Sequence, residues 1–385
     1  MSAHPEGHDC GQVSPRWLAF IAVCVAYLAT TTGEALLAPV FPIASTDLGI
    51  NTAAAGVLFA TLAIGIASAN IVGGLMLRWL TADRVIAIAL IMSALGAGLA
   101  GISNTFDAFV LSQLVLGAGA GLLYPAAIMS VGHFAGPNRR GLAMGLFGVF
   151  FSAGLTLAAA LTMIGAQLDW RWSFAISGVL SLASLSGMIR LDDAPRSERD
   201  GPIFLGLRSV LGLPTAVGIT GGISQYATVS FLPVFAVTTW SLAESSAAAI
   251  LAAGRIASVP AKLATGWLTD RIGTLGAARL TGVLLGISGL IWSLSPSLTP
   301  AIIAAIVFTA TVSGLFPIAN TLAVERAGRK GASLGIFRSA QIAAGALVGL
   351  IIGAVAAEVG LRPTIAVIGT VPLALLAVHD RSVNP

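Results

Sequence analysis

The chain has 385 residues, of which 56% are hydrophobic and only 9% are charged. Soluble globular domains carry about 25% charged residues, so this composition excludes an ordinary soluble domain and predicts an integral membrane protein. The net charge is +4, but the basic residues lie in short loops between apolar runs and form no stripe interleaved with aromatic residues, so we expect no nucleic-acid partner.

Twelve apolar runs are long enough to cross a bilayer, for which a helix needs about 20 residues. In chain order we predict helices at 17–42, 53–77, 84–103, 106–130, 141–165, 171–189, 210–239, 246–268, 277–295, 299–322, 332–356 and 362–379. The first run is too long for the core of a cleavable signal peptide, so we expect it to be a spanning helix. The sequence therefore predicts an all-α integral membrane fold of twelve transmembrane helices in a lipid bilayer.

The connectors between these runs are short and polar, except for residues 190–209, which are dense in charge. We interpret this segment as a cytoplasmic linker between two bundles of six helices, at 17–189 and 210–379. Residues 1–16 and 380–385 are then the N-terminal and C-terminal tails.

The distribution of Lys and Arg predicts the orientation, because these residues concentrate in cytoplasmic loops. Fifteen of the twenty fall on the side that carries both termini, and two, Arg171 and Arg362, fall on the other. The remaining three, Arg255, Lys262 and Arg338, lie inside predicted helices. We therefore expect both termini in the cytoplasm. The usage of Ala, Gly, Leu and Arg favours the plasma membrane of a prokaryote.

The two halves of the chain repeat one another. Landmarks 190–194 residues apart recur in the same order: Pro39-Val40-Phe41 with Pro233-Val234-Phe235, Pro125 with Pro317, Arg140-Gly141 with Lys330-Gly331, and Arg171 with Arg362. This order indicates a duplication. Two copies of six helices have the same orientation, so the axis that relates them runs along the membrane normal.

The strongest local motif is the stretch Gly266-Trp-Leu-Thr-Asp-Arg-Ile-Gly273. A small residue such as Gly266 lets its helix approach a neighbour closely. Asp270 can accept hydrogen bonds from the start of a neighbouring helix and pair with an arginine. Such a cluster can hold one conformation closed and release it in another, so we expect Gly266, Asp270 and Arg271 to act in gating.

This G-x-L-x-D-R-x-G stretch resembles the cytoplasmic loop signature of the major facilitator superfamily. Three further segments also resemble that family: residues 113–121 of helix 4, residues 138–145 between helices 4 and 5, and residues 170–174 at the start of helix 6. The resemblance covers essentially the whole chain and is greatest to the twelve-helix exporter branch. It implies alternating access around a central site lined by helices 1, 4, 7 and 10.

The sequence also departs from the family pattern. In the loop of the first half, Arg78 stands where the family has an acid, and the pair Asp83-Arg84 follows later. We expect Asp83 and Arg84 to take part in gating, together with Arg140, which lies in the loop between helices 4 and 5. Because the first-half loop departs from the pattern, gating is expected to differ between the two halves. Gln113 stands where many proton-coupled members carry Arg, and helix 5 lacks the Gly-Pro pair of the antiporter signature.

Ionisable residues at membrane depth are costly and indicate a functional site. Glu34 is the one acid well inside a predicted helix, and burial disfavours its charged form, so we predict that it couples transport to protons. The alternative is a carboxylate that only pairs with a polar neighbour. Arg255 is predicted either to bind an anionic substrate or to balance the charge of Glu34. Lys262 and Arg338 lie nearer the cytoplasm, where long side chains can extend to the membrane surface, although Arg338 is also a candidate for substrate binding.

Uncharged polar side chains complete the predicted substrate site: Gln113 in helix 4, Gln225 and Tyr226 in helix 7, and Asn320 in helix 10. The alternative for each is a hydrogen bond that joins two helices, because polar side chains also hold spanning helices together.

Together these features predict a secondary active transporter that moves a small organic molecule by alternating access, most simply as proton-coupled efflux. The alternative is uptake or exchange of an organic anion, and a remote alternative is a transporter-like sensor. An enzyme is disfavoured because the four histidines, His4, His8, His133 and His379, lie in tails or at loop edges. No phosphate-binding loop motif is present. We expect no cofactor, no metal and a monomer.

Overall fold

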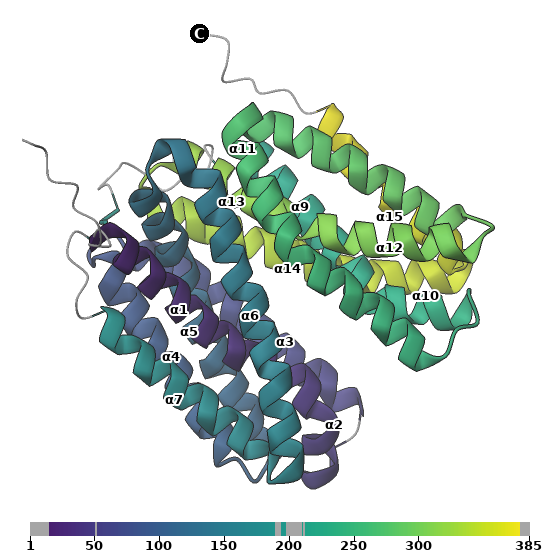
Figure 1. The fold of residues 1–385 in the computed structure, drawn as a ribbon. Coiled ribbons are helices and arrows are strands. Elements are labelled where there is room, and N and C mark those ends of the chain that lie inside the picture. Colours follow the sequence, from purple (N-terminus) through teal and green to yellow (C-terminus); the bar gives the residue numbers. More distant parts are fainter. Residues whose placement is uncertain (1–14, 51, 189–193, 198–209, 211, 378–385) are drawn as a thin grey trace, which may run out of the picture.

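The computed structural model describes residues 15–50, 52–188, 194–197, 210 and 212–377. The elements in these ranges are all helical. They form two bundles, the first from α1 to α7 and the second from α9 to η3 (Figure 1). Nearly all of the predicted tails and most of the predicted linker lie outside the described residues.

The first bundle contains six long helices and two short ones. Their bounds are α1 Pro15–Ala35, α2 Leu37–Asp47, α3 Thr52–Met76, α4 Ala82–Gly101, α5 Phe106–Ala135, the 3-10 turn η1 Pro137–Arg139, α6 Arg140–Gln167 and α7 Trp170–Met188. In this bundle α5 packs against α3 and α4, and α1 packs against α5, α6 and α7.

The second bundle has more interruptions. Its elements are α9 Leu213–Tyr226, the π-helical turn η2 Ala227–Phe231, α10 Leu232–Thr238, α11 Glu244–Leu294, α12 Leu298–Val312, α13 Leu315–Ala327, α14 Gly331–Val359, α15 Leu361–Thr370 and the 3-10 segment η3 Val371–Leu376. Here α11 packs against α12, α15 and η3, and α9 packs against α13 and α14.

Prolines divide three of the helices that the sequence predicted to be continuous. A proline inside a helix lacks an N–H donor, and its ring clashes with the carbonyl four residues earlier. The residue four positions before Pro39 is Ala35, and α1 ends there. The residue four positions before Pro317 is Ser313, which directly follows the end of α12. Pro233 likewise follows the π-helical turn between α9 and α10. Predicted helices 1 and 10 are therefore each built from two α-helices, and predicted helix 7 from two α-helices joined by the π-helical turn.

The element α11 consists of two helices that meet at Gly273, whose φ of 78° lies in the left-handed region. Glycine adopts this conformation without the steric cost that a Cβ imposes. This turn separates the two spans predicted at 246–268 and 277–295.

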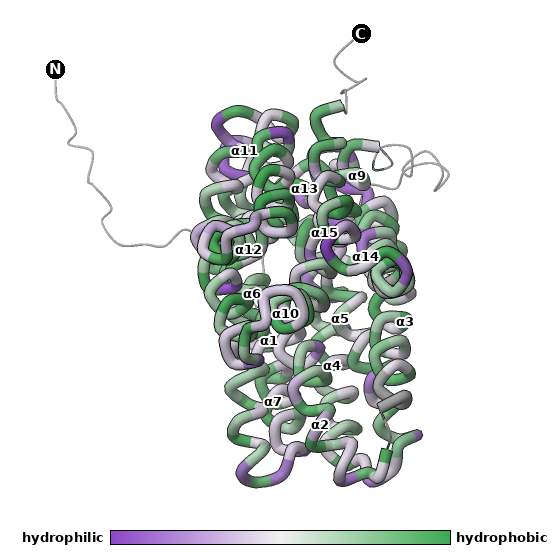
Figure 2. Tube along the Cα trace, turned by 90° about the vertical axis from the view of Figure 1, so that its right-hand side faces the viewer, coloured by the Kyte–Doolittle hydropathy of each residue, from purple (hydrophilic) through white to green (hydrophobic). Residues whose placement is uncertain are grey.

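The apolar segments match the predicted spans. Seven helical stretches in the described part of the chain are long and apolar enough to cross a membrane. The other predicted spans correspond to α7, to α9 with α10, to α14 and to α15 with η3. Figure 2 shows hydrophobic residues along the middle of the helices and hydrophilic residues concentrated at their ends.

Candidate functional site

The two bundles contact each other at the end where basic residues gather. We call it the basic end; there α3 and α13 end, α4, α6 and α14 begin, and α11 turns at Gly273. Its basic residues in the described ranges include Arg139, Arg140, Arg271, Arg279, Arg329 and Lys330. At the opposite end, Arg171 forms a salt bridge of 2.9 Å with Asp47, which also accepts a hydrogen bond from Trp170 Nε1.

The first contact between the bundles joins α6 and α11. Gly141 and Gly266 face each other so closely that a Cβ on either would collide with the backbone of the other. Asp270 Oδ1 accepts a hydrogen bond from Gly141 N at 2.7 Å, and its Oδ2 accepts one from Leu142 N at 2.9 Å. A carboxylate here satisfies N–H groups that have no partner within α6 and lies favourably in the field of the helix dipole.

The second contact joins α3 and α14, and it is the repeat-related counterpart of the first. Gly74 meets Gly331 backbone to backbone, as Gly266 meets Gly141. Gly335 packs in the same way on the carbonyl oxygen of Asn70. Ser339 Oγ donates a hydrogen bond to Ala67 O at 2.6 Å. Small residues thus bring helices of the two bundles together at both contacts.

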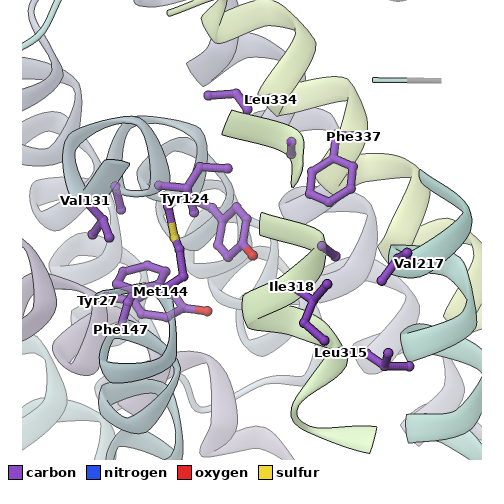
Figure 3. Packing of buried hydrophobic residues seen from close by; sticks show 14 of the residues in the cluster. Tyr27, Tyr124, Val131, Met144, Phe147, Val217, Leu315, Ile318, Leu334 and Phe337 are labelled. Carbon is purple, nitrogen blue, oxygen red and sulfur yellow. The ribbon is translucent and has the colours of Figure 1, made fainter. Parts of the chain in front are cut away.

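Between these contacts, polar side chains of α5, α13 and α14 form the centre of the candidate site. Tyr124 Oη donates a hydrogen bond to Oδ1 of the buried Asn320 at 2.9 Å. The guanidinium carbon of Arg338 lies 4.1 Å from the centre of the Tyr124 ring, and its Nη1 donates to Gln341 Oε1 at 3.1 Å. Figure 3 shows Tyr124 between Tyr27 and Phe147 on one side and the second bundle on the other.

Glu34 lies half-buried near the end of α1. The cation whose charge acts on it is Arg338, which also acts on Tyr27 of α1. The sequence offered Arg255 as the counter-charge and placed Arg338 nearer the membrane surface. The structure instead directs the Arg338 side chain toward α5 of the other bundle, where it joins the surroundings of Glu34.

Lys262 of α11 also crosses between the bundles. Its Nζ donates to Gly148 O at 3.0 Å and contacts Ser152 Oγ, both on α6, and it lies over the ring of Phe151 at 5.5 Å. Its side chain is only 4% exposed, so the alternative in which it extends to the membrane surface is wrong. The sequence contained a signal for this contact. Lys262 precedes Thr269 and Asp270 by about two helical turns, so it lies on the same face of α11 as Asp270, which was expected to contact a neighbouring helix.

Arg255 lies on the same face of α11 as Lys262, since seven residues are two helical turns. It is exposed and about 10 Å farther from the basic end. Gln113 is buried, its Nε2 donates to Ser112 Oγ at 3.3 Å, and its side-chain oxygen has no partner among the described residues. Gln225 is half-buried beside the break after α9, whereas the side chain of Tyr226 lies outside what the structure describes.

The remaining predicted gating residues are spread over the basic end. The Arg271 guanidinium lies over the ring of Trp267 at 5.0 Å from its centre. Arg140, the first residue of α6, acts electrostatically on Glu325 of α13. Asp83 is partly buried in the first turn of α4, and Arg84 beside it is exposed.

The contacts between the bundles involve the parts of the helices nearest the basic end. They use residues 141–152 of α6, 262–270 of α11, 67–77 of α3 and 331–339 of α14. Farther along, α6 turns to its own bundle, where Gly154 packs on Leu28 and Thr31 of α1. Glu34 and Arg255, which remain partly or fully exposed, lie beyond the closed region. From this contact onward the two bundles diverge, α2 of the first bundle and α10 of the second lying apart at their far ends (Figure 1).

Two bacterial proteins are similar to the chain in sequence. "Probable nitrate/nitrite transporter NarK2" of Mycobacterium tuberculosis is 27% identical over 253 residues, and the match spans 62% of each chain. "Quinolone resistance protein NorA" of Staphylococcus aureus is 23% identical over 170 residues, 44% of each chain. The chain thus aligns with less than two thirds of the length of these relatives.

The fold matches that of FucP, a fucose:proton symporter of E. coli, in its outward conformation. The TM-score is 0.80 at 18% identity, over 94% of this chain and 97% of FucP. This match confirms the predicted fold class. The family profile described as "Major Facilitator Superfamily" matches residues 23–349. The chain therefore belongs to the major facilitator superfamily of membrane transporters.

Proposed function

We propose that this transporter moves a small anion by alternating access and that Glu34 couples the movement to protons. The observation that carries the proposal is the charge of the interior. Arg338 and Lys262 contact the other bundle, and the exposed Arg255 lies on the same face of α11 as Lys262. These three cationic side chains stand against the single acid Glu34 among the described residues of this region. An excess of positive charge inside a membrane protein is costly, and a bound anion offsets that cost.

The types of cation support this assignment. A guanidinium presents several N–H donors in a planar fork that matches a carboxylate or a similar oxyanion. Arg338 lies beside Tyr124 and Asn320, so hydroxyl and amide groups are available to orient the anion. The similarity to a protein named as a probable nitrate/nitrite transporter agrees with an anionic substrate.

The basic end is taken as the cytoplasmic end, because Lys and Arg concentrate in cytoplasmic loops. The described conformation is then closed toward the cytoplasm, in agreement with its similarity to FucP in the outward conformation. The substrate enters from outside, binds at Arg255 and Arg338, and leaves after the bundles separate at the basic end. In this proposal residues 17–189 and 210–379 move as units, residues 190–209 join them in the cytoplasm, and the protein acts as a monomer.

Glu34 and Arg338 supply the coupling. When Glu34 is ionised, it attracts the Arg338 guanidinium and competes with an anion for that cation. When Glu34 is protonated, the guanidinium is released to bind the anion. Proton and anion therefore favour each other's binding, which is the reciprocity that linkage requires.

Efflux of an amphipathic compound is the second candidate. Aromatic side chains support it: the rings of Tyr27 and Phe147 stack at 4.1 Å, and Tyr27 also lies 5.7 Å from Phe151. The similarity to NorA agrees with this alternative. Proton-coupled efflux and anion movement differ in the charge of the compound and are separated by the same experiment.

The test is proton flux into proteoliposomes on addition of a panel of organic and inorganic anions and of lipophilic cations. We expect flux with an anion that disappears in Glu34→Gln, while binding of that anion stays measurable. The matched control is Glu244→Gln, which changes an exposed acid at the start of α11. Flux with lipophilic cations alone would support the efflux alternative. Anion flux that persists in Glu34→Gln would remove Glu34 as the proton site.

A further inference from the structure

The two bundle contacts at the basic end are related by the repeat, but only one of them has an acid at the position of Asp270. Gly266 corresponds to Gly74 and Gly141 to Gly331, with offsets of 192 and 190 residues. The residue that corresponds to Asp270 is Arg78, which cannot accept a hydrogen bond. The start of α14 therefore lacks the carboxylate that the start of α6 receives from α11.

A residue of the predicted linker stands at this position. Ser197 Oγ accepts a hydrogen bond from Gly331 N at 3.1 Å. Gly331 is the first residue of α14 and Gly141 is the second residue of α6. The N–H groups in the first turn of a helix have no acceptor within that helix, so both of these N–H groups need an acceptor from elsewhere. Ser197 is 8% exposed. The hydroxyl thus does for α14 what the Asp270 carboxylate does for α6.

Ser197 is held by both bundles at once. Its own N–H donates to Leu77 O at 3.1 Å, just after α3 of the first bundle, while its hydroxyl contacts α14 of the second. Neighbouring residues strengthen the same bridge. Pro195 O accepts from Ala82 N at 3.0 Å, at the start of α4, and Arg329 Nε donates to Arg196 O at 3.1 Å.

We propose that Ser197 is a positioning residue of the transport cycle, which replaces the missing acid of the first-half loop and holds α14 against α3 in the described conformation. Because Ser197 is bonded to both bundles, separation of α3 from α14 must break one of its hydrogen bonds. The helix that it caps carries Arg338 and Gln341 at the candidate site. Residues 195–197, the described part of the linker that makes these hydrogen bonds, are therefore part of the closure at the basic end. The inference goes beyond the proposed function and holds for any substrate.

The experiment measures the distance between the bundles at the basic end by double electron–electron resonance. Spin labels are placed at Arg84 and Leu280, both exposed, in the full chain with Cys10 and Cys24 replaced. Loss of one hydrogen bond at a buried position corresponds to a change of about fivefold in a conformational ratio. We therefore expect Ser197→Ala to lower the ratio of short to long distances by about that factor.

Two further variants test whether the hydroxyl acts as an acceptor. Ser197→Thr retains the hydroxyl and should restore the wild-type ratio. Ser197→Asp supplies a carboxylate, as Asp270 does, and should raise the ratio above wild type. The matched control is Ser186→Ala, since Ser186 is an exposed serine of α7 whose Oγ bonds to Ala183 O of its own helix.

The proposal is overturned if Ser197→Ala leaves the distances unchanged, or if Ser197→Thr and Ser197→Asp behave like Ser197→Ala. A thermal melt of each variant excludes loss of the fold as the cause of a shift. The measurement needs no substrate, so its outcome is independent of whether the proposed anion flux is found.

Discussion

Tyr124 links the two bundles through two different parts of one side chain. Its hydroxyl donates to Asn320 Oδ1 at 2.9 Å, and its ring face receives the Arg338 guanidinium at 4.1 Å. A cation over an aromatic face gains about 0.5–2 kcal/mol, depending on its exposure to water. The hydrogen bond and the ring contact can be separated experimentally, because phenylalanine keeps the ring and removes the hydroxyl.

Tyr124→Phe is expected to weaken the described conformation. It leaves the buried Oδ1 of Asn320 without its donor, which costs about 1–3 kcal/mol, while the contact of the ring with Arg338 remains. A cost of about 1.4 kcal/mol corresponds to a tenfold change in the ratio of two conformations. Labelling of a cysteine at the basic end should therefore become about tenfold faster.

The control for this variant is Tyr27→Phe, which keeps the stacked ring on Phe147 and should leave labelling unchanged. Equal labelling of Tyr124→Phe and wild type would show that the hydrogen bond to Asn320 does not stabilise the closed basic end.

At the scale of elements, closure depends on helices that touch backbone to backbone. Gly141 with Gly266, and Gly74 with Gly331, bring α6 to α11 and α3 to α14. Such contacts gain packing across the full width of the helix backbone, and they tolerate no additional atoms. Each side of the closure also has an acceptor at the start of a helix, Asp270 for α6 and Ser197 for α14.

Gly266→Ala is expected to open the basic end. Its Cβ would collide with the carbonyl oxygen of Gly141, and backbone atoms cannot rotate away as a flexible side chain can. Overpacking of this kind costs about 1–3 kcal/mol, which falls on the closed conformation alone. Transport should drop by about tenfold, because the cycle must pass through that conformation.

Gly98→Ala is the matched control for this change, since a Cβ at Gly98 of α4 would meet no atom within 4 Å. Thermal stability in detergent should be similar for both variants. Equal transport by Gly266→Ala and wild type would mean that α6 and α11 need not approach this closely during the cycle.

At the scale of the whole molecule, the bundles form a pair of similar bodies whose contacts are concentrated at one end. The repeat explains why the two glycine contacts are alike. The polar contacts are unlike, because Lys262 crosses on one side and Arg338 on the other. In the proposed function the substrate binds between the bundles and contacts both, so it should stabilise the assembled molecule as well as its own site.

Addition of a transported anion should therefore raise the melting temperature of the purified protein. A ligand that binds the folded state stabilises it by about 2.7 kcal/mol at a concentration 100 times its Kd. Arg255→Ala should reduce this shift for anions, since a hydrogen bond to a charged group contributes about 1.5–3 kcal/mol. Lipophilic cations provide the comparison, and an equal loss for both classes of compound would contradict a role of Arg255 in anion binding.

The sequence by itself determined the membrane class, the family and the approximate positions of the spans. Charge content and apolar run length suffice for this, because a bilayer admits only long apolar helices or closed barrels. The loop motif around Asp270 placed an acceptor near the start of a helix, and α6 provides that start. The breaks in helices 1, 7 and 10 were missed, although Pro39, Pro233 and Pro317 marked them. The spans were predicted from the length of apolar runs, and that length does not register the clash between a proline ring and the carbonyl four residues earlier.

Only the tertiary structure decided which side chains meet. Hydropathy gives the depth of Lys262 and Arg338 in the membrane but not the neighbour that each one faces, and both cross to the other bundle. Ser197 lies in a charged linker whose composition indicates nothing about contacts, yet it joins Leu77 to Gly331. Depth follows from the local chain, since each helical residue advances a fixed distance. Direction and partner depend on how two six-helix bodies are packed, and that packing is decided by contacts between residues more than a hundred positions apart.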